Sequence, residues 1–520
     1  MAKERNTAFL KGTISLSISV IITKILGVAF KVPLSYVLGD EGMGYFNTAY
    51  AIYGFFYILC TAGVPKSITL LITECKMKDG IYGDKEILMC GLRLFGKIGL
   101  LSSLFNIMCA PAIASFIGNR RAILSIIAIA PSVLFVSLSG VLRGYLNSYE
   151  RLTSIAISQL IEAAAKLALG LLLAFIGVRI SASVNVISAL AISGITIGSV
   201  LSFIYMAIVA FSENKDVNNG QKEYFDKKQI GRRILKNALP IALSSSLLNL
   251  SSTIDLTVII KQLVLNGMSE SAANSMYGNY TTLAVPMFTL VVAVLSPIAT
   301  SYMPRLSRIA IKGDNAEFKQ ELNKLIMITL VISVPASLIF YFYSFDLLDV
   351  LFSAHSSAIG ADMLICLSAG LCLLTALTVV NTALEAQGRI GVTVTSLMIG
   401  AITKFIVSYI LVGQSSLGIL GAPIGTVVSY AVSLSISLVA LERVRVKSRV
   451  LLKLITLYLI GIISFYPVYK LLYSVGAVLH SSFLSMALSI AISSLIYLAI
   501  ALFAYVLLLK CKCLKCTKNR

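Results

Sequence analysis

The sequence predicts an all-α polytopic membrane protein with about fourteen transmembrane helices, arranged as two pseudo-symmetric six-helix lobes plus an extra C-terminal helix pair. Of its 520 residues, 58% are hydrophobic and 13% are charged, and the mean hydropathy is +0.90. Soluble domains carry roughly 25% charged residues, so this composition excludes a water-soluble fold. The longest polar stretch, 213–236, is too short to form a globular domain.

A transmembrane helix needs about 20 mostly apolar residues. Cutting the chain at its polar clusters predicts helices at 13–37, 44–73, 87–117, 122–145, 152–177, 182–212, 234–260, 272–303, 325–343, 362–384, 391–413, 418–441, 451–473 and 483–509. The first helix is far longer than the apolar core of a signal peptide, so we expect it to be retained.

The net charge of +20 is concentrated between the predicted helices. With the N-terminus placed inside, 31 Lys and Arg residues fall in cytoplasmic segments and four fall in outer loops. This asymmetry follows the positive-inside rule. It predicts a multi-pass protein of the bacterial inner (cell) membrane with both termini cytoplasmic, surrounded by membrane lipids and without a nucleic-acid partner.

The second half of the chain echoes the first. An Asn-x-x-Tyr-x-x-Tyr motif opens the second and the eighth predicted helices, as Asn47, Tyr50 and Tyr53 and again as Asn274, Tyr277 and Tyr280. Helices five and eleven align at an offset of 238 residues, which pairs Lys166 with Lys404. Chance similarity between apolar helices is the alternative, but two echoes at similar offsets favour a duplication.

Each half contains an even number of helices, so the halves share one orientation and relate by an axis along the membrane normal. We therefore expect four segments: an N-lobe at 1–212, a cytoplasmic linker at 213–236, a C-lobe at 237–441, and helices 13 and 14 with a basic cytoplasmic tail at 442–520.

A charged side chain near the centre of a transmembrane helix costs about 2.5–3.5 kcal/mol on a translocon scale, so it suggests a functional site. Lys24 lies near the middle of the first predicted helix, and Lys31 follows two turns along the same face. Lysines near a helix end can instead snorkel to the interface, which is the alternative for Lys31 and Lys66.

Polar and aromatic side chains recur every three or four residues along the second predicted helix, a stripe that suits a sugar or a headgroup. An interfacial tyrosine belt would explain Tyr50 but not Tyr57, which lies in mid-span. The predicted substrate-binding residues are Lys24, Lys31, Asn47, Tyr50, Tyr53, Tyr57, Lys66, Lys166, Asn274, Tyr277, Tyr280 and Lys404.

Two acidic residues lie deep in the predicted helices. Glu162 stands one turn before Lys166, which it can neutralise. Asp255 could bind a coupling Na⁺ or proton, or pair with a lysine of the other lobe, and both residues are candidates for the coupling ion. The excess charge within the helices is cationic, which predicts an anionic substrate. Lysines combined with hydroxyl donors suit a lipid pyrophosphate headgroup.

We do not expect enzyme activity, and we expect no cofactor other than a coupling Na⁺ or proton. The longest predicted outer loop offers only Asp346, Asp349 and His355, and no nucleotide-binding GxxxxGK[ST] motif occurs. Three tail cysteines, Cys511, Cys513 and Cys516, could hold a metal, but no histidine adjoins them, and a solvated basic tail is the simpler interpretation. Energy must then come from an ion gradient or the membrane potential.

Several short motifs carry a family resemblance: Lys24-Ile-Leu-Gly27, Gly39 through Tyr45, Gly63-Val-Pro65-Lys66-Ser67, and Tyr277-Gly-Asn-Tyr280 with Pro286. With them the whole chain resembles the stage V sporulation protein B group of polysaccharide exporters. That group belongs to the multidrug/oligosaccharidyl-lipid/polysaccharide (MOP) exporter superfamily and is similar to the MurJ lipid II flippases.

The resemblance implies two lobes that enclose a cavity, alternating access, and a final helix pair that shapes a groove for a polyprenyl tail. It implies a flippase that moves lipid II or a related anionic lipid-linked oligosaccharide to the outer leaflet, with cell-wall synthesis enzymes as candidate partners. The lipid II flippases have two headgroup-binding arginines in helix 1. Lys24 occupies the position of the first in this chain, and Phe30 occupies the position of the second. In helix 8 the lipid II flippases have an acidic residue followed by an arginine. This chain has Tyr280 and Thr281 at those positions, a departure from their pattern that bears on whether lipid II itself is the cargo. The alternatives are a cation-coupled multidrug exporter of the same superfamily and a non-transporting scaffold for cell-wall synthesis.

Overall fold

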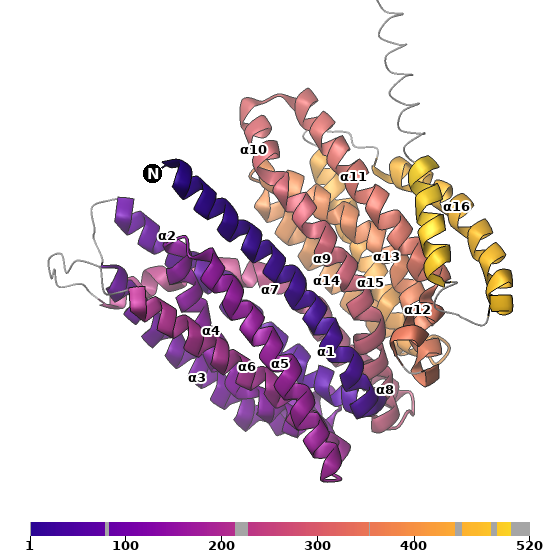
Figure 1. Cartoon of the computed structure of the whole chain (residues 1–520), viewed down its shortest axis with the longest axis horizontal. Helices are drawn as coiled ribbons and strands as arrows, with labels where there is room; N and C mark the ends of the chain where they lie inside the picture. Colours follow the sequence, from indigo (N-terminus) through magenta and orange to yellow (C-terminus); the bar gives the residue numbers. More distant parts are fainter. Residues whose placement is uncertain are drawn as a thin grey trace, which may run out of the picture. The chain divides into compact units, whose positions relative to one another are not determined.

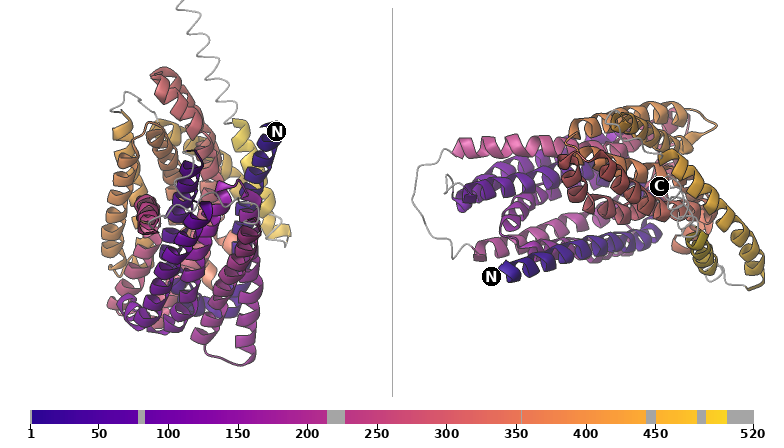
Figure 2. Two further views of the ribbon diagram at one scale, coloured as in Figure 1. Left: turned by 90° about the vertical axis from the view of Figure 1, so that its left-hand side faces the viewer. Right: turned by 90° about the horizontal axis from the view of Figure 1, so that it is seen from above.

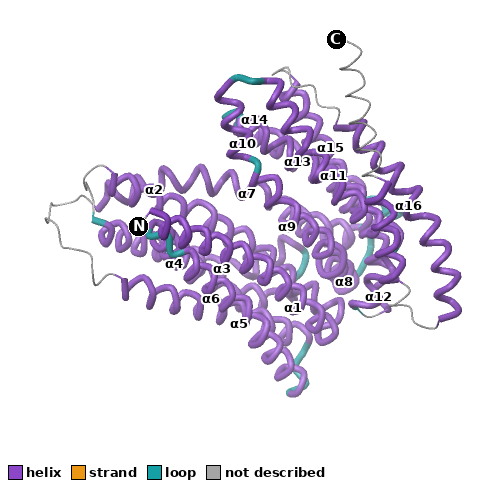
Figure 3. Tube along the Cα trace, turned by 45° about the horizontal axis from the view of Figure 1, so that its top comes forward, coloured by secondary structure: helices purple, strands orange, loops and turns teal. Residues whose placement is uncertain are grey.

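The structure, a computed structural model, describes residues 2–77, 83–213, 227–352, 354–442, 450–479 and 486–500. These residues are almost entirely helical, and no strand occurs among them (Figure 1; Figure 3). The first seven helices are α1 (Ala2–Ile58), α2 (Val64–Met77), α3 (Asp84–Ile117), α4 (Ile123–Ser148), α5 (Leu152–Arg179), α6 (Val184–Glu213) and α7 (Lys227–Leu265). The others are α8 (Glu270–Asn279), α9 (Val285–Ser301), α10 (Met303–Lys312), α11 (Asn315–Phe342), α12 (Ser344–Leu351), α13 (Ala354–Ala386), α14 (Ile390–Val412), α15 (Gly421–Glu442), α16 (Val450–Leu479) and a final helix at 486–500.

By packing, the chain divides into two compact units, Met1–Thr282 and Leu283–Arg520, here called unit 1 and unit 2. Unit 1 contains α1 to α8, because α7 packs on α1, α2 and α3 and α8 packs on α1. In unit 2, α13 packs against α9, α11 and α15. The division into two six-helix lobes stays a prediction.

The polytopic all-α fold is confirmed. Nine of the helices in the described ranges are long and apolar enough to cross a membrane. Their outer faces carry large exposed apolar side chains, such as Leu101, Phe105 and Met108 on α3, which lipid would cover. Most of the remaining predicted spans also fall on helices, and the total of fourteen stays a prediction.

Helix α1 covers the first predicted helix and the start of the second, two helical segments that meet at Gly39, where the chain reverses. Gly39 has φ 63° and ψ −178°, a conformation that residues with a Cβ rarely adopt. The reversal brings Tyr50 back beside Lys31. One glycine therefore places the aromatic stripe of the second predicted helix against the cationic stripe of the first.

The turns of unit 1 lie at alternating ends. At one end, Arg121 Nη1 is 3.1 Å from Glu41 Oε1, and Asn274 Nδ2 donates to the Glu41 carbonyl at 2.7 Å. These contacts join three turns that the sequence predicts to be on the outer side. At the other end, the Tyr149 hydroxyl donates to Asp84 at 2.6 Å and joins two predicted cytoplasmic turns.

Two π-helical segments interrupt equivalent helices of the two halves: η1 (Leu59–Gly63) and η3 (Tyr280–Ala284). Each is followed directly by a Val-Pro pair, at Pro65 and at Pro286. A proline has no N–H to close the preceding turn, which favours a local widening of the helix. This echo, at an offset of 221 residues, is a third sign of duplication.

Helical hairpins of both units are closed by small residues. A Cβ added to Gly194 of α6 would collide with Gly170 of α5, and one added to Gly400 of α14 would collide with Ser433 of α15. Such small residues let membrane helices approach closely. Helices α3 to α6 consequently run side by side along unit 1 (Figure 2).

Candidate functional site

Lys31, Tyr50, Lys166 and Phe30 form what we call the cation–aromatic cluster. Lys166 Nζ lies 4.6 Å from the centre of the Tyr50 ring and 5.3 Å from that of the Phe30 ring. Lys31 Nζ lies 6.0 Å from the centre of the Tyr50 ring. Two ammonium groups, one from α1 and one from α5, therefore lie near a single tyrosine ring.

The cluster concentrates positive charge. The two nitrogen atoms lie within about 11 Å of each other, which is the sum of their distances to the Tyr50 ring centre. At an effective dielectric constant of 20 they repel by at least about 1.5 kcal/mol. The ring offsets part of this repulsion, since a cation–π contact contributes about 0.5–2 kcal/mol. An anion between them would replace the repulsion by attraction, and ammonium groups are good phosphate ligands.

Aromatic rings continue from the cluster along α1. The ring centres of Tyr50 and Tyr53 are 6.0 Å apart, and those of Tyr53 and Tyr57 are 5.5 Å apart. Arg143 of α4 lies next to Tyr57 and makes a 3.0 Å salt bridge with Glu162 of α5. The predicted tyrosine stripe thus exists, and it runs from the cluster to a buried ion pair.

Arg143 is a site residue that the sequence did not indicate. It lies close to the predicted cytoplasmic end of its helix, where an arginine is expected on topological grounds. In the structure its side chain is only 8% exposed. The prediction that Glu162 neutralises Lys166 is corrected, because Glu162 makes its salt bridge with Arg143 while Lys166 contacts rings.

A second polar arrangement joins α1 to α8 and η3, and we call it the α1–α8 seam. Lys31 Nζ donates to the Thr281 carbonyl at 3.0 Å, and Asn47 Nδ2 donates to Thr282 Oγ1 at 2.8 Å. Asn274 Nδ2 donates to the Glu41 carbonyl. The seam residues are Lys31, Asp40, Glu41, Asn47 and Thr48 of α1, Asn119 of the turn before α4, and Asn274, Asn279, Thr281 and Thr282 of α8 and η3.

The centre of the seam is fully buried. Asn119 Nδ2 reaches both Thr48 Oγ1, at 2.9 Å, and Asn274 Oδ1, at 2.6 Å, and all three residues have no exposed surface. Backbones approach closely here: a Cβ on Gly44 would collide with Asn274, and one on Gly278 with the Asp40 carbonyl. Polar groups buried this way are satisfied only while the two helices stay together.

The other predicted residues are distributed differently. Lys24 and Lys66 are exposed, Tyr277 and Tyr280 are buried within the packing of α8 and η3, and Asp255 is buried on α7. Lys404 is 1% exposed and belongs to α14 of unit 2, so the cation–aromatic cluster of unit 1 does not contain it. Substrate contact by these residues stays a prediction.

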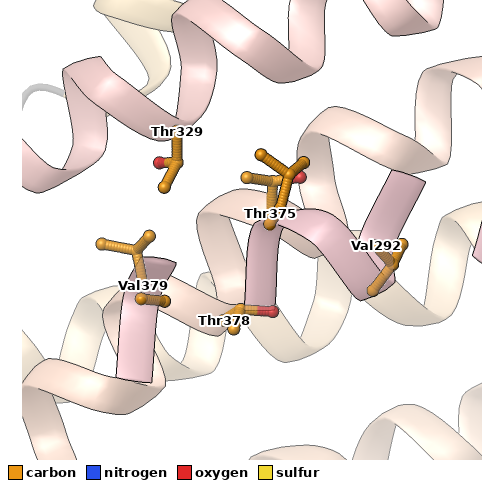
Figure 4. A pocket seen from close by; sticks show the side chains of 7 residues that line it. Val292, Thr329, Thr375, Thr378 and Val379 are labelled. Atoms are coloured by element: carbon orange, nitrogen blue, oxygen red, sulfur yellow. The ribbon is translucent and has the colours of Figure 1, made fainter. Parts of the chain in front are cut away.

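Unit 2 contains a small pocket between α9, α11 and α13, with a volume of about 10 Å³, room for about one water molecule (Figure 4). Its polar groups are the hydroxyls of Thr329, Thr375 and Thr378, and each donates to a carbonyl of its own helix. Sites for drug-sized ligands are roughly 300–1,000 Å³. The pocket is too small to hold a lipid headgroup bearing a sugar.

Within the described ranges, no three His, Cys, Asp or Glu side chains are grouped to hold a metal ion. The tail cysteines Cys511, Cys513 and Cys516 lie outside those ranges.

Comparison with known proteins places this arrangement in a family. Residues 9–310, more than half of the chain, match the model of the polysaccharide biosynthesis protein family. The chain belongs to this family. Among curated relatives, the stage V sporulation protein B of Bacillus subtilis (strain 168) is 25% identical over 437 residues, covering 82% of both chains. The lipid II flippase MurJ of the same organism is 20% identical over 459 residues, covering 84% of this chain and 83% of its own.

A solved structure of a lipid II flippase MurJ in an inward closed conformation has the same fold. It matches with a TM-score of 0.74 at 17% identity, over 95% of this chain and all of the other. The resemblance to sporulation protein B and to the lipid II flippases is confirmed. These relatives are transporters and flippases rather than enzymes, and this member of the polysaccharide biosynthesis protein family belongs with them.

Proposed function

We propose that this chain is a flippase for an anionic lipid-linked cell-wall precursor, with lipid II or a related polyprenyl-pyrophosphate oligosaccharide as its cargo. It moves the headgroup from the cytoplasmic to the outer leaflet by alternating access. The proposal is supported by the family, by the MurJ-like fold and by one local observation: two ammonium groups lie within 6.0 Å of the centre of the Tyr50 ring, in an apolar helical unit.

The cation–aromatic cluster supplies what a pyrophosphate and a sugar need. Lys31 and Lys166 offer positive charge to the phosphates. The rings of Tyr50, Tyr53 and Tyr57 offer apolar faces with hydroxyl groups at their edges, which suit a sugar. The Arg143–Glu162 pair carries no net charge and leaves the cluster cationic.

In this proposal both termini are cytoplasmic, so the α1–α8 seam closes the outer side. The driving force is an ion gradient or the membrane potential. Of the two candidate coupling residues, Glu162 is paired with Arg143 and Asp255 is buried on α7.

Transport of labelled lipid II in proteoliposomes tests the proposal. Purified protein should move fluorescent lipid II from the inner to the outer leaflet, so that dithionite quenches it faster than in protein-free vesicles. A multidrug exporter would instead move an organic cation such as ethidium, and a scaffold would move neither.

Complementation supplies the cellular test. Expression of the chain in a strain depleted of its own lipid II flippase should restore growth if lipid II is the cargo. Lipid transport in vesicles without complementation would point to a different lipid-linked sugar. Failure to move any polyprenyl-pyrophosphate lipid would overturn the proposal.

A further inference from the structure

We propose that Lys31 couples headgroup binding to opening of the α1–α8 seam: an anion that binds Lys31 removes its ammonium group from the Thr281 carbonyl. The inference rests on the proposed function, because it takes the anionic headgroup as the ligand. It adds a role that the family and the relatives do not assign, namely that one lysine serves both the site and its closure.

Lys31 belongs to both arrangements. Its Nζ is 3.0 Å from the Thr281 carbonyl oxygen of the seam and 6.0 Å from the centre of the Tyr50 ring in the cluster. A phosphate next to Lys166 and Tyr50 would be a second acceptor for the same group. The phosphate carries a full negative charge whereas the peptide carbonyl carries only a dipole, so the phosphate attracts the ammonium group more strongly.

The Thr281 carbonyl depends on Lys31 because of the local helix type. Thr281 lies in η3, where hydrogen bonds run from each carbonyl to the amide five residues later. For Thr281 that amide would belong to Pro286, which has no N–H. The lysine therefore satisfies a carbonyl that the helix itself leaves without its π-helical partner.

Loss of this hydrogen bond would weaken the closed seam. The Thr281 carbonyl is partly buried. Without a partner it would favour a movement of η3 away from α1 toward water or another donor. The other contacts across the seam, such as Asn47 with Thr282, do not involve Lys31 and would set how firmly the seam closes without the ligand.

Hydrogen–deuterium exchange of the full-length protein in lipid nanodiscs, with undecaprenyl pyrophosphate as the probe, tests this role. Peptides that cover 40–48 and 274–284 report the seam, and native mass spectrometry reports lipid binding separately. In the parent protein, saturating lipid should raise exchange in both peptides at least threefold. In Lys31→Met, exchange should already be raised without lipid, and lipid should add nothing. Lys31→Arg should keep the response, because the guanidinium can serve both acceptors.

Two further variants separate coupling from simple loosening. Thr282→Val removes the Asn47 contact while leaving Lys31 in place, so basal exchange should rise and lipid should still raise it further. Lys261→Met removes an exposed cation of α7 that lies over Phe116 and outside the seam, and it should behave like the parent.

Each outcome decides something. Lipid binding without a seam response in the parent, or an undiminished response in Lys31→Met, would overturn the coupling role and leave the proposed function standing. Absence of saturable lipid binding to the parent would overturn both.

Discussion

Glu162 and Arg143 show how single residues keep charge inside a membrane protein. Their side chains are 18% and 8% exposed and 3.0 Å apart, so each is the other's main source of compensation. Removal of one partner of a buried pair leaves an uncompensated charge, which costs more than the pair contributes. The pair therefore acts as a support for the tyrosine stripe rather than as a second anion site.

Replacement of this carboxylate should be strongly destabilising. Glu162→Gln leaves Arg143 buried without a counter-charge and should lower stability by about 3–5 kcal/mol, seen as a lower melting temperature of the purified protein. The double variant Glu162→Gln/Arg143→Gln should recover part of the loss. Glu317→Gln, at an exposed position of α11, is the matched control and should change little. Equal melting temperatures for Glu162→Gln and the control would contradict the buried-pair interpretation.

Lys166 should matter for transport more than for folding. Loss of one charge-assisted contact costs roughly 1.5–3 kcal/mol, so Lys166→Gln should slow flipping of anionic lipid about ten- to a hundredfold. Lys24→Gln, which changes the exposed lysine two turns before Lys31, should act in the same direction. Lys97→Gln, an exposed lysine of α3, provides the comparison for insertion and expression. Parental flipping rates for Lys166→Gln would remove this lysine from the site.

The sequence predicted Lys31, Lys166 and Tyr50 because a charge or a hydroxyl within an apolar span is unusual and needs a reason. It did not predict Asn119 and Thr48, since polar residues at helix ends are common and gain meaning only when another helix covers them. The sequence also did not predict which residue forms a salt bridge with Glu162. A lysine lies one turn away along the same helix, yet Glu162 pairs with Arg143 of another helix.

Among the secondary-structure elements, α1 and α8 meet at glycines. A Cβ at Gly44 would collide with Asn274, whereas one at Gly54, two and a half turns later on α1, meets no atom within 4 Å. Gly44→Ala should therefore hold the seam open and abolish net transport, with faster hydrogen exchange at 40–48. Gly54→Ala is the control, and it should be neutral or slightly stabilising because alanine favours helix. A Gly44→Ala protein with parental exchange and transport would show that the seam tolerates separation or readily repacks.

Most helices follow from hydropathy and length, because an apolar run of about 20 residues has few other options in a bilayer. The π-helical interruptions of these helices are harder to predict from the sequence. Nothing in the composition of 59–63 or 280–284 marks them as π-helical, and only the Val-Pro pairs that come after them, compared between the halves, provide a signal. The non-helical conformation of Gly39, at which the chain reverses, was likewise visible only in the backbone.

For the whole molecule, alternating access requires the seam to open in every cycle. In a cysteine-free background that transports, Asn47→Cys/Thr282→Cys places two thiols where the wild-type side chains are 2.8 Å apart. A short bifunctional thiosulfonate should join them and stop lipid flipping, and a reductant should restore it. Either single cysteine variant treated in the same way is the control. Continued flipping by the joined protein would exclude opening at this seam.

The two predicted lobes and the two packed units have different boundaries, because they describe different properties of the chain. Repeats in the sequence indicate how the chain arose, whereas packing groups α7 and α8 with α1 to α6 because the seam is closed. A single sequence carries no information on which of several states is populated. The repeat boundary therefore stays a prediction.

Tyr50 lies near two ammonium groups in a chain that contains no tryptophan at all. Tyr50→Trp would accordingly introduce the sole indole fluorophore, close to two positive charges. Arrival of a phosphate would change the local electric field and shift the emission maximum through the Stark effect. The position could thus provide an optical readout of cargo arrival, free of background emission from other indoles and independent of any labelled lipid.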